Sequence, residues 1–196
     1  MNPLIQVKQR TPFFLVALLL ACFAIPPRAR AVESYLIECE FLKSSATVGI
    51  SGGELTIQEG GGWSHNAQLF WAAPKPMPSP FNLGFQDVTL TLRFNVPAAG
   101  TYEIILHYTK APDYGTVRVS LDGHDVYSYE GYDSKVTLHA DSLGVQTLAS
   151  GTHVLKFKVE NKHLNSNGYF VGLDRIDLRP PPFKWFKLPP SKVRQP

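Results

Sequence analysis

Two glutamates near the start of the chain are spaced so that they could hold a cation. Glu38 and Glu40 lie in residues 34–42, where apolar and polar side chains alternate as in a β-strand. Side chains two positions apart on a strand project from the same face, so the two carboxylates repel each other unless the face is wet or a cation lies between them. The pair is therefore either solvated or metal-bound.

Trp63 offers a second kind of chemistry, the stacking of a flat ring on a ligand. Three glycines at residues 60–62 precede it, and such a flexible loop can place an indole at a surface. The alternative is that Trp63 packs on the core, which is what we expect for Trp71, embedded in an apolar run.

The sequence contains no catalytic constellation. Its six histidines are scattered without the spacing of a metal tripod, and His107 and His153 fall on predicted strands, where a core or surface role is the default. A nucleophile elbow, a phosphate-binding glycine loop and a dinucleotide fingerprint are all missing. We therefore expect a protein that is not an enzyme.

An all-β fold would have to position these residues. The most regular stretch is 87–123, where apolar residues alternate over three predicted strands and Asp122-Gly123 supplies a tight hairpin turn. Roughly nine or ten short strands without an amphipathic helix indicate a β-sandwich of jelly-roll type. In residues 169–178 the alternation slips, which predicts a bulge near Asp174 that re-aims a side chain toward a site.

The chain divides into three predicted parts. Residues 1–31 resemble a secretory signal peptide, because basic residues precede a short apolar run and a small-residue site ends at Ala31. Residues 32–178 form the sandwich domain, and residues 179–196 form a Pro-rich basic tail. The predicted location is secreted or periplasmic, without a membrane span; a lipid on Cys22, at a loosely lipobox-like site, is the alternative. Cys39 is then the only remaining cysteine, so no internal disulfide forms, and we expect its side chain to be buried.

The net charge of +3 comes from the two ends of the chain. Residues 32–178 hold ten basic and sixteen acidic side chains, a net charge of −6. A nucleic-acid-binding surface would need a cationic stripe along the phosphate backbone. The acidic body argues against a nucleic-acid partner.

Four motifs give the domain a family resemblance. In their order and spacing, IECE, LRFNVPAAGTYEIILHYT, SGTHVLKF and GLDRIDL are similar to carbohydrate-binding modules of families six and thirty-five. The resemblance covers residues 34–178 and implies a galactose-binding-domain-like jelly roll. Related modules occur beside exported glycoside hydrolases, where some serve assembly instead of sugar capture, so the fold does not settle the function.

The resemblance implies a structural calcium ion held by Glu38, Glu40 and Asp174. First and last strands are neighbours in such a sandwich, three converging carboxylates need neutralising, and Ca²⁺ accepts six to eight oxygen ligands. The alternative is three solvated or hydrogen-bonded acids.

The resemblance also implies a sugar site in loops at one end of the sandwich. A sugar presents an apolar face that stacks on an aromatic ring, and hydroxyls that need amide or carboxylate partners. The candidate residues are Trp63, Tyr108, Asp113, Tyr114, Asn161, Asn165, Asn167 and Tyr169. For the asparagines and Asp113 a role in a turn competes with ligand contact, and for Tyr114 packing does.

Two functions follow from these expectations. The first is a secreted, non-catalytic carbohydrate-binding module with one structural calcium ion. The second is a protein-interaction or assembly module of the same fold, with an exported glycoside hydrolase as its partner and the aromatic tail around Trp185 as the docking segment. A hydrolase acting on sugar is disfavoured, because calcium accounts for Glu38 and Glu40 more economically than catalysis does.

Overall fold

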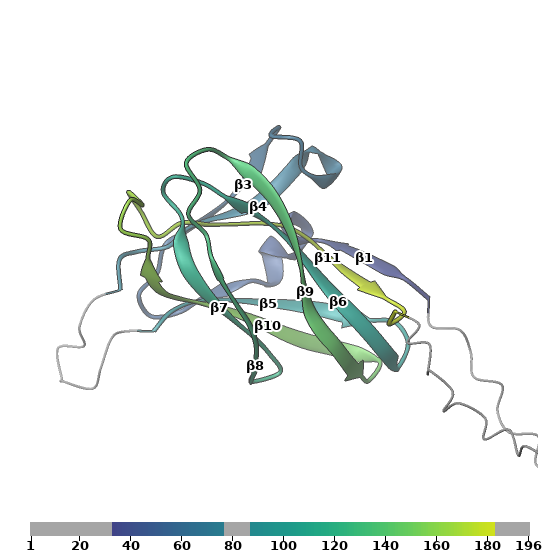
Figure 1. The fold of residues 1–196 in the computed structure, drawn as a ribbon. Coiled ribbons are helices and arrows are strands. Elements are labelled where there is room, and N and C mark those ends of the chain that lie inside the picture. Colours follow the sequence, from purple (N-terminus) through teal and green to yellow (C-terminus); the bar gives the residue numbers. More distant parts are fainter. Residues whose placement is uncertain (1–32, 77–86, 183–196) are drawn as a thin grey trace, which may run out of the picture. The chain divides into compact units, whose positions relative to one another are not determined.

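The computed structural model describes residues 33–76 and 87–182, which fold into two antiparallel β-sheets (Figure 1). The predicted leader with Cys22, and the tail around Trp185, lie outside these residues. The strands are β1 (Tyr35–Glu38), β2 (Thr47–Val48), β3 (Glu54–Glu59), β4 (Ala67–Ala72), β5 (Val88–Val96), β6 (Gly100–Lys110), β7 (Gly115–Leu121), β8 (His124–Glu130), β9 (Thr137–Leu148), β10 (Gly151–Lys162) and β11 (Val171–Arg179). Two short 3₁₀ helices, η1 (Cys39–Ser45) and η2 (Ser64–Asn66), complete the described part. The predicted all-β sandwich is confirmed.

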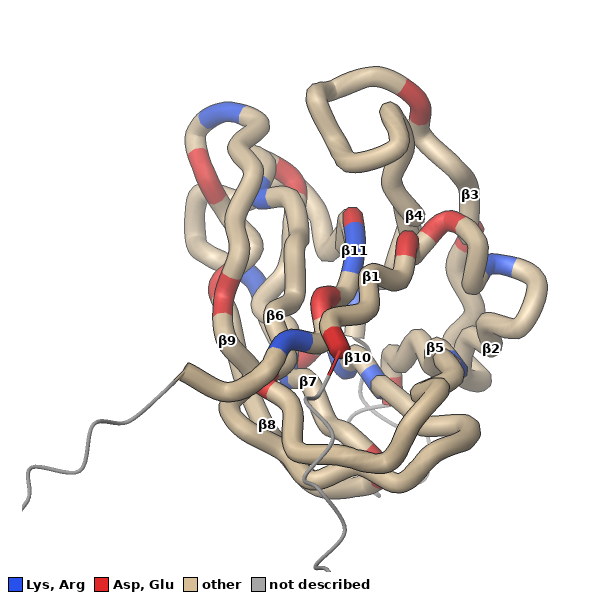
Figure 2. Tube along the Cα trace, turned by 90° about the vertical axis from the view of Figure 1, so that its right-hand side faces the viewer, with Lys and Arg blue, Asp and Glu red and all other residues tan. Residues whose placement is uncertain are grey.

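β11 is the central strand of the sheet that carries the candidate residues. This sheet, sheet A, has the order β3-β4-β11-β6-β9, and β1 also pairs with β11. Figure 2 shows β11 between β4 on one side and β6 and β9 on the other. Residues 171–173 of β11 pair with β4, and residues 175–178 pair with β1, so the first and last strands are neighbours, as predicted. Sheet B has the order β2-β5-β10-β7-β8.

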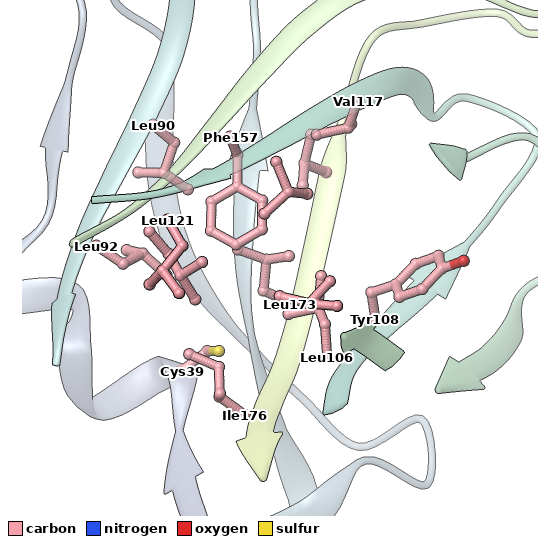
Figure 3. Close-up of a cluster of buried hydrophobic side chains, with 14 of the residues drawn as sticks. Cys39, Leu90, Leu92, Leu106, Tyr108, Val117, Leu121, Phe157, Leu173 and Ile176 are labelled. Carbon is pink, nitrogen blue, oxygen red and sulfur yellow. The ribbon is translucent and has the colours of Figure 1, made fainter. Parts of the chain in front are cut away.

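Apolar side chains of both sheets fill the space between them. β5 alternates in the way that its sequence predicts, with five buried side chains: Val88, Leu90, Leu92, Phe94 and Val96. Figure 3 shows Phe157 of sheet B in one cluster with Leu106 and Leu173 of sheet A, and all three are fully buried. Burying a side chain of this size stabilises the fold by about 1.5–3 kcal/mol.

The predicted first strand is wrong beyond Glu38. The chain leaves the sheet there and forms η1, in which successive side chains turn by about 120° instead of alternating. Cys39 and Glu40 therefore both point inward, with 0% and 4% of their surface exposed, whereas Phe41 is 63% exposed. The expected burial of Cys39 is confirmed. Glu40, however, does not lie beside Glu38 on a strand.

The predicted bulge at Asp174 is present. Leu173 pairs with Tyr108 of β6, and Arg175 pairs with the next residue back, His107, so Asp174 has no partner on that side. The extra residue lets Leu173 and Ile176 both point into the core. It also leaves the Asp174 side chain free to make contacts outside the ladder.

The predicted hairpin at Asp122-Gly123 is also confirmed. Both residues have positive φ, 48° and 88°, and they join Leu121 of β7 to His124 of β8. The Asp122 carboxylate accepts a hydrogen bond from the Val154 amide at 2.9 Å and lies 2.6 Å from Nδ1 of His153. The turn is therefore tied to β10.

The part of the chain that the structure describes has no helix long and apolar enough to cross a membrane.

Candidate functional site

The loop between β3 and β4 has an unusual backbone. We call residues 60–66 the Trp63 loop. Its three glycines have φ of 89°, 72° and 79°, and His65 and Asn66 have φ of 50° and 58°. Left-handed angles at non-glycine residues cost free energy and persist where the surroundings fix them. Trp63 and Ser64 therefore sit in a segment that its own contacts must hold in place.

A chain of hydrogen bonds fixes the ring of Trp63. Its indole N–H donates to the Thr109 hydroxyl at 2.8 Å, and that hydroxyl donates to Oε1 of Gln68 at 2.7 Å. The Gln68 amide then donates to Oε1 of Gln58 at 2.7 Å and, more weakly, to the Tyr114 hydroxyl at 3.4 Å. Gln68 is completely buried, so these bonds satisfy a side chain that would otherwise be costly to bury.

The direction of these hydrogen bonds determines which donors remain available to a ligand. An indole N–H can only donate, so each following group accepts on one side and donates on the other. Tyr114 receives a hydrogen bond from Gln68 and keeps its own O–H available. Burial raises the pKa of Tyr114 to about 12, so the hydroxyl keeps its proton at neutral pH. Gln58, which accepts through Oε1, likewise keeps its amide N–H groups available.

Gly172 of β11 makes room for this arrangement. It pairs with Phe70 of β4 and with Thr109 of β6, so it lies beneath the bridge from Thr109 to Gln68. A Cβ at this position would collide with Oε1 of Gln68 and lie 2.7 Å from the Tyr114 hydroxyl oxygen. The network can therefore cross β11 only where that strand has no side chain.

Four residues of this network, Gln58, Trp63, Gln68 and Tyr114, line a pocket of about 410 Å³ on sheet A. Its lining combines three aromatic rings with amides and carboxylates: Gln58, Glu59, Trp63, Gln68, Phe70, Ala111, Asp113, Tyr114 and Val136. The structure thus brings together three residues that the sequence singled out, namely Trp63, Asp113 and Tyr114. The pocket lies among the Trp63 loop, the β6–β7 connection and Val136 before β9.

Tyr108 does not share this pocket. It is 1% exposed, its hydroxyl donates to Asp141 at 2.5 Å, and its ring lies 4.0 Å from that of Tyr129. On β6 it occupies the inward phase, two residues after Leu106. Its side chain belongs to the core and does not line the pocket, in contrast to the sugar contact that was predicted for it.

The asparagine-rich loop, residues 163–170, contacts the segment that carries Asp113 and Tyr114. Asn165 and Asn167 in this loop are exposed and do not line the pocket, and the half-buried Tyr169 packs on the core beneath Lys162. Asn161, also exposed and outside the pocket, lies on β10, where it pairs with Thr116 of β7. The backbone N–H of Asn167 donates to the Pro112 carbonyl at 2.9 Å, and that of Phe170 donates to the Asp113 carbonyl at 3.1 Å. These backbone bonds hold the segment that carries Asp113 and Tyr114.

Sequence reasoning missed several residues that build the site. Ser166 is buried, and its hydroxyl contacts the Tyr114 carbonyl at 2.8 Å and that of Gly168 at 3.0 Å. Gln68 occupies the outward phase of β4, where a polar residue is unremarkable by pattern. Its burial comes from the Trp63 loop and the β6–β7 connection, which only the tertiary structure places over it.

The three predicted metal ligands contact two consecutive residues of the Trp63 loop, Glu38 and Asp174 through Ser64 and Glu40 through His65. The Ser64 backbone N–H donates to Asp174 Oδ1 at 2.9 Å, and its hydroxyl donates to Glu38 Oε1 at 2.7 Å. Nδ1 of the next residue, His65, lies 3.2 Å from Glu40 Oε1, although without the geometry of a hydrogen bond. Glu38 Oε2 and both carboxylate oxygens of Glu40 are buried without a hydrogen-bond partner.

The electrostatics show that these carboxylates influence one another. Burial raises the pKa of Glu40, and repulsion from Glu38 adds to the effect. Burial is also the main cause of the raised pKa of Asp174, again with a contribution from Glu38. The pKa of the Cys39 thiol is raised by burial first and then by all three carboxylates.

The unpaired oxygens of this cluster are of the kind that a hard divalent cation binds. Three buried carboxylate oxygens lack a hydrogen-bond partner, and Glu40 Oε1 faces only His65, so their burial carries a cost that a cation would lower. Within residues 33–76 and 87–182, no three His, Cys, Asp or Glu side chains already lie together at metal-binding distances. The case for an ion therefore rests on the unpaired oxygens of Glu38 and Glu40, with Asp174 tied to them through Ser64.

Comparisons with known proteins identify the fold. No family model matches the chain, and no curated protein is similar to it in sequence. A xanthan lyase from Paenibacillus matches with a TM-score of 0.60 at 18% identity, over 74% of this chain and 13% of the lyase. The chain thus spans about an eighth of that enzyme's length, and the likeness concerns the fold alone.

Two family 35 carbohydrate-binding modules are also similar in structure. One comes from an environmental isolate, with a TM-score of 0.46 and 12% identity over 75% of this chain and 93% of the module. The other comes from Clostridium thermocellum, with a TM-score of 0.43 and 17% identity over 76% of this chain and 100% of the module. These two modules are similar structures only, and membership of family six or family thirty-five stays a prediction. The fold is a jelly-roll β-sandwich.

Proposed function

We propose that the chain is a non-catalytic carbohydrate-binding domain whose ligand occupies the pocket beside Trp63. The observation that carries this proposal is the combination of groups around one cavity. Trp63, Phe70 and Tyr114 provide apolar rings, the Tyr114 hydroxyl and the Gln58 amide provide free donors, and carboxylates provide acceptors. A sugar ring, with an apolar face and hydroxyls at its edge, needs such a mixture.

The charge of the pocket favours a neutral sugar. Asp113 and Glu59 line it, and its lining contains no lysine or arginine. A uronate or sulfate group would face two carboxylates without a cationic partner, and juxtaposed like charges cost several kcal/mol. Neutral hydroxyls, in contrast, can donate to both carboxylates. We therefore infer a preference for neutral over acidic glycans.

For Asn161, Asn165, Asn167 and Tyr169 we propose a supporting role. The loop that contains Asn165, Asn167 and Tyr169 holds the Asp113–Tyr114 segment through backbone hydrogen bonds, whereas Asn161 pairs with Thr116 of β7 at the end of β10. None of the four side chains lines the pocket. Replacing Asn165, which is exposed, should therefore leave sugar affinity nearly unchanged. A ligand held by the asparagine loop itself would make the opposite prediction.

The remaining expectations from the sequence stay proposals. We propose export through a leader at residues 1–31, a single domain from residue 32 to residue 178, and a Ca²⁺ ion at Glu38, Glu40 and Asp174. When bound, the ion would supply the positive charge that these three carboxylates lack. A glycoside hydrolase partner and docking through the tail belong to the alternative, an assembly module.

A glycan array with the full chain, followed by calorimetry on the sugars that bind, tests the proposal. Trp63→Ala should weaken binding about tenfold, because truncating an aromatic residue central to a binding site commonly costs more than about 1 kcal/mol. Tyr114→Phe keeps the ring and removes only the hydroxyl donor, so it should weaken binding by about two- to tenfold, the loss expected for one hydrogen bond of about 0.5–1.5 kcal/mol. Lys156→Ala, on the outer face of sheet B, is the matched control and should bind like the wild type.

Three results would contradict the proposal. A blank array from folded protein would favour the assembly module. Equal loss of affinity in Asn165→Ala and in Trp63→Ala would move the site to the asparagine loop. Release of reducing sugar from a bound glycan would show catalysis.

A further inference from the structure

The Trp63 loop connects the carboxylate cluster to the pocket within three consecutive residues. Trp63 lines the pocket, whereas Ser64 and His65 contact the three acids. No other described segment contributes side chains both to the pocket lining and to the contacts of Glu38, Glu40 and Asp174. The loop backbone therefore gives a direct route by which a change at the carboxylate cluster can reach Trp63.

The anchors of this loop are few. On the pocket side Trp63 is anchored by the hydrogen bond from its indole N–H to the Thr109 hydroxyl. Within the loop, the Asn66 amide donates to the Trp63 carbonyl at 3.1 Å, and the Gly60 amide donates to the Asn66 carbonyl at 2.9 Å. On the other side both polar groups of Ser64 bind carboxylates. Five of the seven residues have positive φ, so the loop keeps its shape only while these anchors hold.

The carboxylate side of the loop is incomplete. The Glu40 side chain is 3% exposed, and neither of its oxygens has a hydrogen-bond partner. Together with Glu38 Oε2 it offers unpaired oxygens beside the two oxygens that Ser64 already occupies. A cation bound there would offset the repulsion between these carboxylates, and would fix Glu38 and Asp174 as acceptors for Ser64.

From this geometry we propose that a divalent cation at Glu38, Glu40 and Asp174 positions Trp63 for ligand binding, with Ser64 as the positioning residue that links the two sites. The inference deepens the proposed function and rests on it for the identity of the ligand. The link between cation and loop can be measured with the cation alone. It predicts that the ion orders the loop before any sugar is present.

Hydrogen exchange of the full chain, in Ca²⁺ and in EDTA without sugar, tests the link directly. We expect Ca²⁺ to slow exchange of the Ser64 and Asn66 amides by about fivefold or more, the lower end of typical coupling between sites. Ser64→Ala should still gain thermal stability from Ca²⁺ but lose most of this added protection. Ser142→Ala is the matched control, because its hydroxyl also donates to a glutamate, Glu103, away from both sites.

A second variant tests the coupling from the pocket side. Coupling between two sites is reciprocal. Thr109→Val removes the hydrogen bond that holds the Trp63 ring, so it should weaken Ca²⁺ affinity by about fivefold, the factor expected for the exchange of the loop amides. Thr109 makes no contact with the three acids in its hydrogen bonds. Calorimetry with Ca²⁺ alone measures this. Unchanged exchange in the loop on addition of Ca²⁺, whether or not the ion binds, would overturn the inference. Because no sugar is present, that result would leave the carbohydrate-binding proposal standing.

Discussion

Gly172→Ala is the substitution that most directly tests the hydrogen-bond network across sheet A. Gly172 has no positive φ, so its backbone accepts an alanine without strain. The added methyl group, however, would collide with Oε1 of Gln68 and lie 2.7 Å from the Tyr114 hydroxyl oxygen. Gln68 must move, and the hydrogen bond that it accepts from Thr109 at 2.7 Å must lengthen or break.

The cost follows from two contributions. Overpacking a well-filled site costs about 1–3 kcal/mol, and leaving the buried groups of Thr109 and Gln68 unpaired costs a further 1–3 kcal/mol or so. The reduced freedom of the unfolded chain returns about 0.4–1 kcal/mol. We therefore expect a net loss of about 1–5 kcal/mol, which lowers the melting temperature of a chain this size by about 2–4 °C for each kcal/mol.

Urea unfolding of Gly172→Ala, Gln68→Ala and the double variant measures this as a cycle. Without the Gln68 side chain the methyl group meets only the Tyr114 hydroxyl, so Gly172→Ala should cost at least about 1 kcal/mol less in that background. An equal cost in both backgrounds would refute the account of the clash. A wild-type midpoint for Gly172→Ala alone would refute the placement of the network over β11.

Three further predictions concern buried polar groups. Burial works against a charged His153, but its hydrogen bonds to Asp122 and to a backbone carbonyl raise its pKa. The contact between His153 and Asp122 should therefore stabilise the fold below about pH 6.5 and lose that contribution as pH rises through the raised pKa of His153. Melting curves from about pH 6 to 9 should show a decrease in melting temperature, and Asp122→Asn should reduce this decrease. Of the chain's two thiols, that of Cys39 should react with a disulfide reagent only on unfolding, because it is buried and burial raises its pKa; rapid modification in the native state would contradict its position. Tyr108→Phe removes the 2.5 Å bond to Asp141 and should cost about 1.5–3 kcal/mol in urea unfolding. That bond is the main cause of the lowered pKa of Asp141, so the cost should shrink as acid protonates the carboxylate, and a pH-independent cost would speak against it.

The sequence by itself determined the strands and their turns. Period-2 alternation predicted β5 and β6, because a strand with one buried face needs apolar residues at every second position. Asp122-Gly123 predicted its hairpin through positive φ at both residues. Even the bulge at Asp174 was visible, since an extra residue in a strand shifts the phase of the alternation.

The local sequence pattern did not predict where two side chains point. The alternation of residues 34–42 continues past Glu38, but the chain turns into η1 there and brings Glu40 inward. Tyr108 was predicted to contact a sugar, although its phase on the strand places it in the core. In both cases the direction of a side chain was misjudged.

Only the tertiary structure decided what the candidate site is made of. Gln68, Thr109 and Gly172 come from three strands of sheet A, and their network exists because β4, β11 and β6 lie side by side. Ser64 reaches Glu38 and Asp174 because the Trp63 loop folds over the junction of β1 and β11. Burial and hydrogen bonding of a polar side chain depend on which segments cover it, and segments 26 and 110 residues apart are joined here by contacts that no local pattern encodes.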